Sequence, residues 1–376
     1  MNVEALRRTS SMSRHAAILR VDYLLLGCAL IMLGLGLVMV MSASGVMAEL
    51  SYGDKYLFFK KQSLYAVTGL VVMAAMTFID RRVLYRLTYV VLGCVVLLLA
   101  ATLIFGYEAG GARRWLHLGP LSLQPLEAAK IALVFYLAYF FSHKQEHVKT
   151  FSVGFLPPVL ITGLLGGLLL LQPDFGGAVF LCILLVLMSI VGGTNILYLG
   201  SSLLLGLGCG WLLISQSEYR LKRWSAFLDP FANAQDTGYQ LVQSLYAFGS
   251  GGWFGQGLGA GKQKLLFLPE AHNDFILAVL GEELGFVGVS LVFICLGVLL
   301  WRAFSIALAQ ADAQDRFTGY GMALVLAVGT VLNISVVLGM APPKGVPMPF
   351  LSYGGSSLLV SCFCVGMLLN LSRRAE

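Results

Sequence analysis

The sequence predicts an all-α polytopic membrane protein, and its composition and apolar runs support that prediction. Hydrophobic residues make up 58% of the 376 residues and charged residues only 12%, whereas a soluble domain has about 45–50% and about 25%. Apolar runs of about 20 residues, long enough to cross a hydrocarbon core of about 30 Å as a helix, recur along the chain. This composition excludes a soluble enzyme. The net charge of +6 is spread out, so no nucleic-acid partner is expected.

We expect about ten membrane-spanning helices in one domain, residues 23–372. A tail, residues 1–22, would precede this domain, and residues 373–376 would follow it. The basic opening is similar to a signal peptide, but the first apolar run is too long for a cleaved signal and is read as an uncleaved helix. The expected spans are 23–43, 62–79, 84–105, 125–141, 153–171, 175–192, 196–215, 274–302, 317–342 and 350–371.

The basic residues predict the orientation of the chain, because Lys and Arg accumulate in cytoplasmic loops. A cytoplasmic N-terminus places more Lys and Arg inside than in the short outer loops, which hold Lys55, Lys60, Lys61, Arg113, Arg114 and Lys344. The inner set is Arg7, Arg8, Arg14, Arg20, Arg81, Arg82, Arg86, Lys144, Lys149, Arg302, Arg316, Arg373 and Arg374. Both termini would then be cytoplasmic, and the loop before Asp274 would lie outside.

One connection, residues 216–273, is much longer than the others. Loops beyond about 12–15 residues are usually functional or disordered. Its aromatic residues and the helical spacing of LVQSLYAF favour order, with short amphipathic helices at the outer face. The segment GSGGWFGQGLGAG would supply turns; a dinucleotide fingerprint is not expected there because no strand precedes it.

Acidic residues concentrate where this loop meets the eighth span, in FLPEAHNDFILAVLGEELG. Asp274 would open that span beside Asn273 as a cap, where the helix dipole favours an acid. Capping alone would explain an Asp but not the neighbouring Glu270 and His272. We therefore predict that Asp274 is catalytic and that Glu270 and His272 contact substrate.

Glu282 and Glu283 are expected about 12 Å deeper in the membrane, at 1.5 Å per helical residue. A charged residue there costs about 2.5–3.5 kcal/mol and needs compensation. The two side chains fall on different helix faces, so one would line a polar cavity and the other would pair with another helix. Two structural hydrogen-bonding acids are an equally good interpretation.

Several cations would share the outer side with Asp274. In GGARRWLHLGPLSLQPLEAAK, Pro125 suits the first turn of a helix, which makes Glu127 and Lys130 neighbours at i, i+3. Converging cations suit a diphosphate, although solvation and contact with lipid headgroups would also explain any one of them. The set comprises Arg113, Arg114, Lys130, Lys262, Lys264 and Lys344.

The last outer loop, MAPPKGVPMPFLSYGGSS, is rich in Pro and Gly and contains Ser352 and Ser356. Irregular backbone at membrane depth is tolerated only where it lines a cavity or is buried in protein. This loop is therefore predicted to border the site, with both serines near substrate.

These stretches together resemble the SEDS family (shape, elongation, division, sporulation) over nearly the whole chain. The motifs are GARRWLHLGPLSLQPLEAAK, QPDFGGA, YRLKRWSAFLDPF, GYQLVQSLYAFGSGGWFGQGLG, LPEAHNDFILAVLGEELG and PMPFLSYGGSS, in family order. The resemblance implies the SEDS fold and a peptidoglycan glycosyltransferase that polymerises lipid II at the outer face of the bacterial inner membrane. GARRW and PPKG are more similar to the division branch, which acts at the septum, than to the elongation branch.

The resemblance also implies roles for single residues. The family's essential acid matches Asp274, and its functional residues before the fourth span match Arg114, Gln124, Glu127 and Lys130. Leu126 and Leu277 depart from the family pattern, which more often has Ser or Ala and Phe there. We expect Asp274 to act as general base and undecaprenyl diphosphate to leave.

The implied partners are a class B penicillin-binding protein transpeptidase (FtsI-like), other divisome membrane proteins and membrane lipids. A divalent cation, Mg²⁺ or Mn²⁺, is expected to assist the leaving group, without an organic cofactor. Besides a polymerase of the elongation branch, two alternatives of other classes stay open: a lipid II flippase with Glu282 and Glu283 as an intramembrane relay, and a non-catalytic divisome scaffold. The flippase is disfavoured because no paired broken helices are evident.

Overall fold

Long helices account for most of the chain, as its apolar runs predict. The computed structural model describes residues 21–109, 112–118, 121–265 and 267–373. Within the described part, eight helices are long and apolar enough to cross a membrane; α8 is apolar but shorter, and α3 is not among the eight. The long helices are α2 Tyr23–Tyr52, α3 Leu57–Phe78, α5 Thr88–Phe105, α6 Pro125–His143, α7 Leu156–Leu171, α8 Phe175–Val191, α9 Ile196–Ser215, α12 Ile276–Leu308, α13 Ala313–Val337 and α14 Gly355–Ser372.

Short polar side chains set several helix starts. Asp22, Asp174 and Asp312 precede α2, α8 and α13, and each accepts a hydrogen bond from a backbone N–H of the first turn. Such caps satisfy donors that have no partner within the helix. Pro125 occupies the first turn of α6 as expected. Its ring fixes φ at a helical value, and the N–H that proline lacks would have had no partner within the helix at this position.

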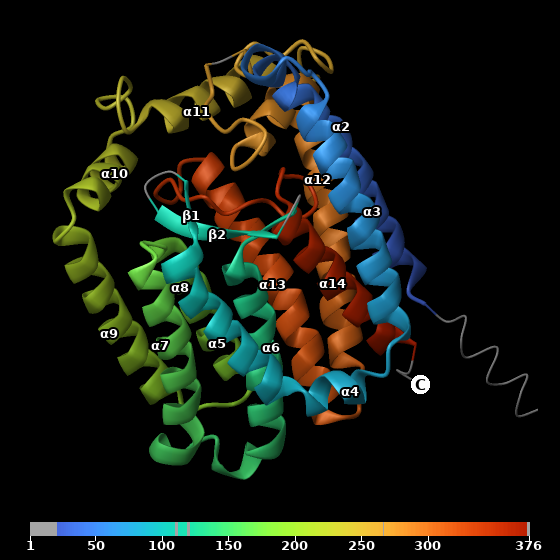
Figure 1. The fold of residues 1–376 in the computed structure, drawn as a ribbon, viewed down its shortest axis with the longest axis vertical. Coiled ribbons are helices and arrows are strands. Elements are labelled where there is room, and N and C mark those ends of the chain that lie inside the picture. Colours follow the sequence, from blue (N-terminus) through green and yellow to red (C-terminus); the bar gives the residue numbers. More distant parts are fainter. Residues whose placement is uncertain (1–20, 110–111, 119–120, 266, 374–376) are drawn as a thin grey trace, which may run out of the picture.

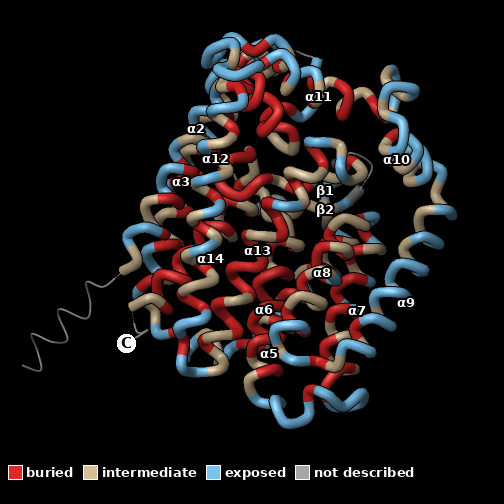
Figure 2. The backbone as a smooth tube through the Cα atoms, turned by 180° about the vertical axis from the view of Figure 1, so that it is seen from behind, coloured by how far each residue is buried: buried red, intermediate tan, exposed pale blue. Residues whose placement is uncertain are grey.

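The helices run along the long axis of the molecule, with α6, α13 and α14 at its centre (Figure 1). Burial follows this arrangement: α6, α13 and α14 are largely buried, while α9 stands at the edge and buries only Leu199 among its described residues (Figure 2). Helix α14 packs on α3, and α13 packs on both α6 and α12. Side chains exposed along α9 are apolar, which fits contact with lipid tails.

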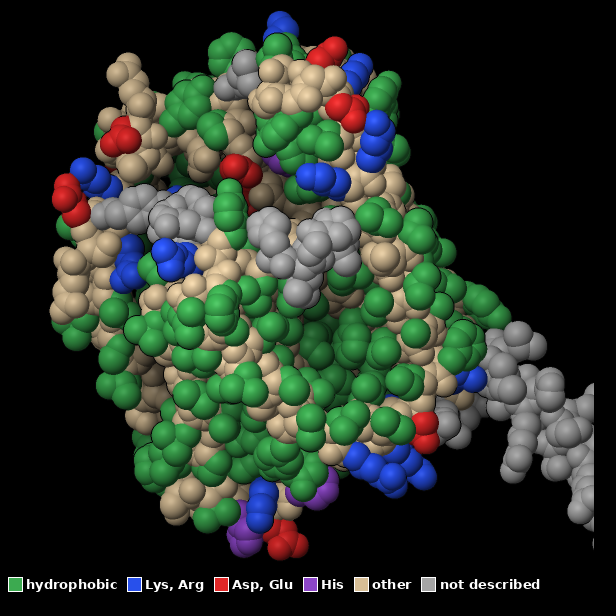
Figure 3. Space-filling view, viewed as in Figure 1, with side chains coloured by type: hydrophobic (Ala, Val, Ile, Leu, Met, Phe, Trp, Pro, Cys, Tyr) green, Lys and Arg blue, Asp and Glu red, His purple; other side chains and the backbone are tan. Residues whose placement is uncertain are grey.

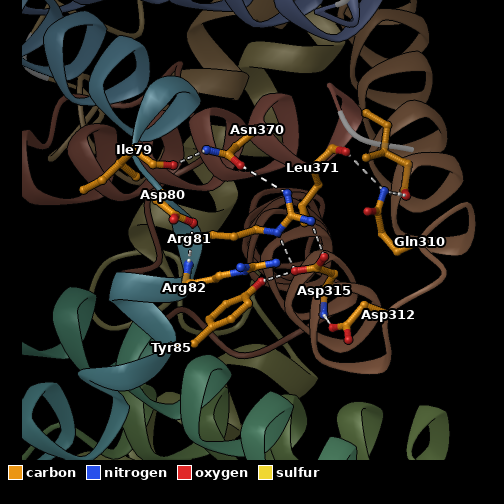
Figure 4. A network of polar contacts seen from close by, with 11 residues as sticks. Ile79, Asp80, Arg81, Arg82, Tyr85, Gln310, Asp312, Asp315, Asn370 and Leu371 are labelled. Atoms are coloured by element: carbon orange, nitrogen blue, oxygen red, sulfur yellow. Dashed lines mark hydrogen bonds and ion pairs between the residues drawn. The ribbon is translucent and has the colours of Figure 1, made fainter. Parts of the chain in front are cut away.

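A buried polar network closes one end of the bundle (Figure 4). The guanidinium of Arg81 donates two hydrogen bonds to the carboxylate of Asp315, and the Tyr85 hydroxyl donates to the same group at 2.7 Å. Asn370 donates to the carbonyls of Met76, Thr77 and Ile79, the last turn of α3 and its cap. Arg302 pairs with Asp22 beside Ser372. Described residues expected on the cytoplasmic side thus meet at one end.

Smaller elements connect the long helices. They are α4 Arg81–Arg86, a 3₁₀ turn Gln145–His147, a π turn Phe151–Phe155, α10 Glu218–Leu228 and α11 Tyr239–Gly251. Helices α10 and α11 lie in the long connection and form an arch over the end opposite α4 (Figure 1), so the prediction of short helices in that loop is confirmed.

A small antiparallel sheet was not predicted. Strands β1 Tyr107–Ala109, β2 Ala112–Leu118 and β3 Leu121–Leu123 pair in the order β1-β2-β3. In the register, Tyr107 faces Trp115 and Leu116 faces Leu123. The sheet lies beneath the α10–α11 arch, and the surface between the two is hollowed with Lys and Arg side chains near its rim (Figure 3).

Candidate functional site

Asp274 lies just before α12 rather than at its start. The helix begins at Ile276 after Phe275, and no side chain caps it. The expected cap, Asn273, instead donates from its side chain to that of Glu270. The prediction that Asp274 and Asn273 open the helix is therefore wrong by two residues, and capping does not explain the acid.

Burial and neighbouring charges adjust the acidity of Asp274. Protein atoms surround most of its carboxylate, and this burial raises its pKa from 3.8 to about 7. The charge of Glu270 raises the pKa further, while that of Arg223 lowers it. Within the described part of the chain, no hydrogen-bond partner of the carboxylate is recorded. A carboxylate with such a pKa can accept a proton near neutral pH.

The last outer loop passes directly against this carboxylate. A Cβ atom placed on Gly345 would lie 2.9 Å from Oδ2 of Asp274, so the backbone of the loop passes close to the carboxylate. The side-chain amide of Asn333 on α13 donates to the carbonyl of Asp274 at 2.9 Å and to that of Val346 at 2.8 Å. The prediction that this loop borders Asp274 is thereby confirmed.

Lys344, next to Gly345, extends toward the start of α8. A Cβ on Gly176 would lie 2.5 Å from its Cε atom, and the carboxylate of Asp174 lies close enough to act on its charge. Burial lowers the pKa of Lys344 to about 8, against the opposing charges of Asp174 and Cys182. This ammonium has no recorded hydrogen bond or ion pair with another described residue, so it can bind an anion.

Two arginines adjoin the same helix start. Arg114 on β2 donates to the carbonyl of Pro173 at 2.5 Å, and its buried Nε atom has no hydrogen-bond partner among the described residues. Arg220 on α10 lies over the ring of Phe175, 5.6 Å from its centroid. Together with Lys344 they surround a helix N-terminus, whose dipole also favours anions. Arg113, the neighbour of Arg114, is exposed on the sheet.

The expected pair on α6 forms inside the bundle. Lys130 donates to Glu127 at 2.7 Å, and both side chains are buried. The Lys130 ammonium also lies 4.6 Å from the centroid of the Phe180 ring on α8, while Oε2 of Glu127 has no partner. This pair therefore adjoins the start of α8 from the inside.

Both predicted serines are engaged by the backbone. The Ser352 hydroxyl accepts from the N–H of Met348 at 2.8 Å. The Ser356 hydroxyl accepts from the N–H of Gln124 at 3.0 Å and donates to the carbonyl of Ser122. They fold the last loop and attach β3 to α14, so the structure places them in supporting positions.

The ring of His272 is buried between aromatic residues. It lies 4.7 Å from the Phe58 ring and 5.6 Å from the Tyr353 ring, measured between centroids. Burial lowers the pKa of His272, and the charge of Glu270 opposes this effect. Glu270 is exposed and adopts φ 55° in the turn before Asp274. Of the two, only Glu270 presents its side chain to solvent.

Glu282 and Glu283 accept hydrogen bonds from residues of the long outer connection. Glu282 accepts from the N–H groups of Lys262 and Gln263, so backbone donors of the outer connection engage its carboxylate. Glu283 accepts from Lys264 at 2.5 Å and from Ser42 of α2 at 2.7 Å, which confirms that one of these acids pairs with another helix. The structural interpretation of both acids is the one the contacts support, and it also accounts for Lys264.

Both acids lie in the first segment of α12, which ends at a break at Gly285, with φ 66° and ψ −167°. Asp274 bonds to Asn333, about 20 residues along α13, and Glu283 bonds to Ser42, about 20 residues beyond the cap of α2. The expected depth of both acids, about 12 Å below Asp274, stays a prediction.

Backbone pairing satisfies the groups that the break exposes. The N–H groups of Gln256 and Gly257 donate to the carbonyls of Glu282 and Glu283, each at 3.0 Å. In return, the N–H groups of Phe286 and Val287 donate to the carbonyls of residues 252 and 253. The glycine-rich segment predicted to supply turns thus docks into the break, as irregular backbone at membrane depth requires.

Sequence reasoning missed Arg223 and Asn333. Arg223 lies in YRLKRWSAFLDPF, whereas the predicted set of cations takes only Lys262 and Lys264 from the long connection. Its Nη1 donates to the carbonyl of Pro343, next to Lys344, at 3.3 Å. Asn333 was absorbed into an apolar span, where a single polar residue gives only a weak signal.

The described residues include no group of three or more His, Cys, Asp or Glu side chains placed to hold a metal ion. The side chains around Asp274 therefore do not fit a resident metal centre, and no step below depends on one. Mg²⁺ is commonly held by one or two carboxylates together with substrate phosphates, so the divalent cation stays a prediction.

The fold and the site define a polytopic helical membrane protein with a half-buried acid near several cations at one end of its bundle. The model of the cell cycle protein family FtsW/RodA/SpoVE matches residues 22–376. The chain belongs to this family, the SEDS family expected from the motifs.

Relatives and solved structures agree with that assignment. A protein of Trichlorobacter lovleyi named "Probable peptidoglycan glycosyltransferase FtsW" is 44% identical, with 93% of each chain covered. The stage V sporulation protein E of Bacillus subtilis is 38% identical over 94% of this chain and 97% of its own. RodA of Thermus thermophilus matches with a TM-score of 0.69 and 31% identity, covering 94% and 97%.

A further solved chain belongs to a structure described as "Structural coordination of polymerization and crosslinking by a peptidoglycan synthase complex". It matches with a TM-score of 0.78 and 31% identity, over 95% of this chain and 99% of that one. These matches confirm the predicted fold and a multi-pass protein of the inner membrane.

Proposed function

We propose that this chain is a peptidoglycan glycosyltransferase that polymerises lipid II for septal wall synthesis at the outer face of the inner membrane. The single observation that carries the proposal is a carboxylate of raised pKa, Asp274, beside a loop that presents Lys344, whose ammonium has no recorded partner among the described residues. Relatives named peptidoglycan glycosyltransferase support the class of reaction.

Asp274 takes the proton from the 4-hydroxyl of the acceptor sugar as that oxygen attacks the anomeric carbon of the donor. The new glycosidic bond forms as the bond to the lipid diphosphate breaks, and the anomeric centre inverts. One carboxylate is enough, because a diphosphate leaves without the acid that hydrolysis of an ordinary glycoside needs. Lys344, Arg114 and the start of α8 stabilise the charge that develops on the leaving group.

The proposal includes partners and orientation. A class B penicillin-binding protein would cross-link the product, because the similar solved chain belongs to a peptidoglycan synthase complex that coordinates polymerization and crosslinking. Other divisome proteins would localise the pair. Both termini would be cytoplasmic, with Asp274 outside.

The flippase and scaffold alternatives lose support. A flippase would use Glu282 and Glu283 as a relay, but both acids are engaged by the outer connection. A scaffold needs no acid of raised pKa.

The test is polymerisation of labelled lipid II by the purified chain with its transpeptidase partner in detergent, where neither a flippase nor a scaffold makes polymer. Asp274→Asn should lower the rate at least about 10²-fold, since general-base assistance contributes about 10²–10⁴-fold. The control is Asp236→Asn, an exposed acid in the same outer connection, which should keep the full rate. Polymer formed at the normal rate by folded Asp274→Asn would refute the proposal. A parallel reaction with a chelator tests whether polymerisation needs the predicted divalent cation.

A further inference from the structure

Asn333 is almost completely buried in the last two turns of α13, with 1% of its surface exposed. Its side-chain nitrogen has two hydrogens, and each finds a carbonyl: that of Asp274 at 2.9 Å and that of Val346 at 2.8 Å. These two carbonyls belong to segments about 70 residues apart in the chain. One carries the proposed base, and the other is the loop that presents Lys344.

The two bonds bring these segments together at the carboxylate itself. Gly345 lies between Lys344 and Val346 in the loop, and a Cβ on Gly345 would lie 2.9 Å from Oδ2 of Asp274. The N–H of Val346 also donates to the carbonyl of Lys344 at 2.8 Å, so the loop turns tightly at this point. A shift at Val346 would therefore move both Gly345 and Lys344 relative to Asp274.

The chemistry of the side chain suits this position. Asp has no donor when ionised, Ser and Thr have one, and a primary amide presents two hydrogens from one nitrogen without carrying a charge. The oxygen of the same amide, Oδ1, is buried and has no hydrogen-bond partner among the described residues. An orphaned buried acceptor is costly, so local stability alone does not explain Asn at this position.

We infer that Asn333 is a positioning residue that fixes the carboxylate of Asp274 and the loop carrying Lys344 in one catalytic arrangement. It touches neither substrate nor reacting atoms, and it acts through the two carbonyls. The inference rests on the proposed function of Asp274. Loss of the bonds would let the loop withdraw and water reach the carboxylate, which removes the burial that raises the pKa of Asp274.

The test uses Asn333→Leu, which keeps the size of the side chain and removes both donors. We expect kcat to fall about 10–100-fold with KM for lipid II within about twofold, since 1 Å of misplacement can cost about 10²-fold. The acidic limb of the pH profile of kcat/KM should move to lower pH by at least about one unit. Asn333→Gln, which keeps the amide on a longer chain, should recover part of the rate.

The matched control is Asn370→Leu. Asn370 is a buried Asn that also donates to backbone carbonyls, but at the opposite end of the bundle (Figure 4). It should lower thermal stability as Asn333→Leu does, without moving the pH profile. If Asn333→Leu loses activity only in proportion to unfolded protein and keeps the normal profile, the inference fails. An active Asp274→Asn would instead overturn the proposed function, so the two failures are distinguishable.

Discussion

At the scale of single residues, two groups of shifted pKa predict a narrow pH optimum. Asp274 must be ionised to accept a proton, and its raised pKa of about 7 makes kcat/KM rise with pH through that value. Lys344 must be charged to stabilise a diphosphate, and its lowered pKa of about 8 makes kcat/KM fall above that value.

The Lys344→Arg variant keeps its charge at any working pH. The alkaline limb of its pH profile should therefore disappear, while the acidic limb stays. A pH profile of polymerisation by both proteins checks this; an unchanged alkaline limb would show that another group causes it.

Most of the residues around Asp274 were predictable from their types, but their partners were not. A lone acid at a loop–helix junction, cations on the same side and a Pro/Gly-rich loop all indicated a site. The sequence does not show which cations are already paired: Lys264 is held by Glu283, whereas Lys344 has no recorded partner among the described residues. Such pairing depends on contacts between residues far apart in the chain, so composition and spacing did not indicate it.

At the scale of elements, the break in α12 makes a sharp prediction. Gly285 has a backbone conformation that is essentially restricted to glycine, and an added Cβ would lie 2.2 Å from the backbone nitrogen of Gly255. Gly285→Ala should therefore release the docked segment around Gly255, lower the melting temperature and expose that segment to protease. Gly297→Ala in the same helix meets nothing within 4 Å; it should not lower the melting temperature, because Ala favours a helix over Gly, and it should not expose the segment. Equal melting temperatures for the two variants would contradict the docking.

Helix positions were predicted well because their 20-residue apolar runs are a strong signal, whereas the break and the sheet were not. Residues 274–302 read as one apolar run, since a glycine inside such a run does not by itself show a break. The strands Tyr107–Ala109 and Leu121–Leu123 are only three residues long, too short for alternation to be recognised. A Gly-Gly pair at positions 110 and 111 was the available signal for a hairpin.

At the scale of the whole molecule, the two ends of the bundle have different chemistry. One end is closed by ion pairs, the buried pair of Arg81 with Asp315 and the half-buried pair of Arg302 with Asp22. Breaking a buried pair is strongly destabilising, because it leaves a charge without compensation. The other end also contains a buried pair, Lys264 with Glu283, but it keeps an acid and an ammonium without recorded partners among the described residues. These two groups are available to substrate at the end predicted to be outside.

The predicted orientation, with Asp274 outside and the closed end in the cytoplasm, determines which residues a thiol reagent can reach in spheroplasts. Glu270 is exposed beside Asp274, and Arg82 is exposed on α4 at the closed end. A membrane-impermeant thiol reagent should modify Glu270→Cys in spheroplasts but should reach Arg82→Cys only after the membrane is permeabilised. The native cysteines lie inside or beside apolar helices, and the unsubstituted chain measures their background. Labelling of Arg82→Cys alone in sealed spheroplasts would invert the orientation and place Asp274 on the cytoplasmic side, where polymerisation at the outer face would be impossible.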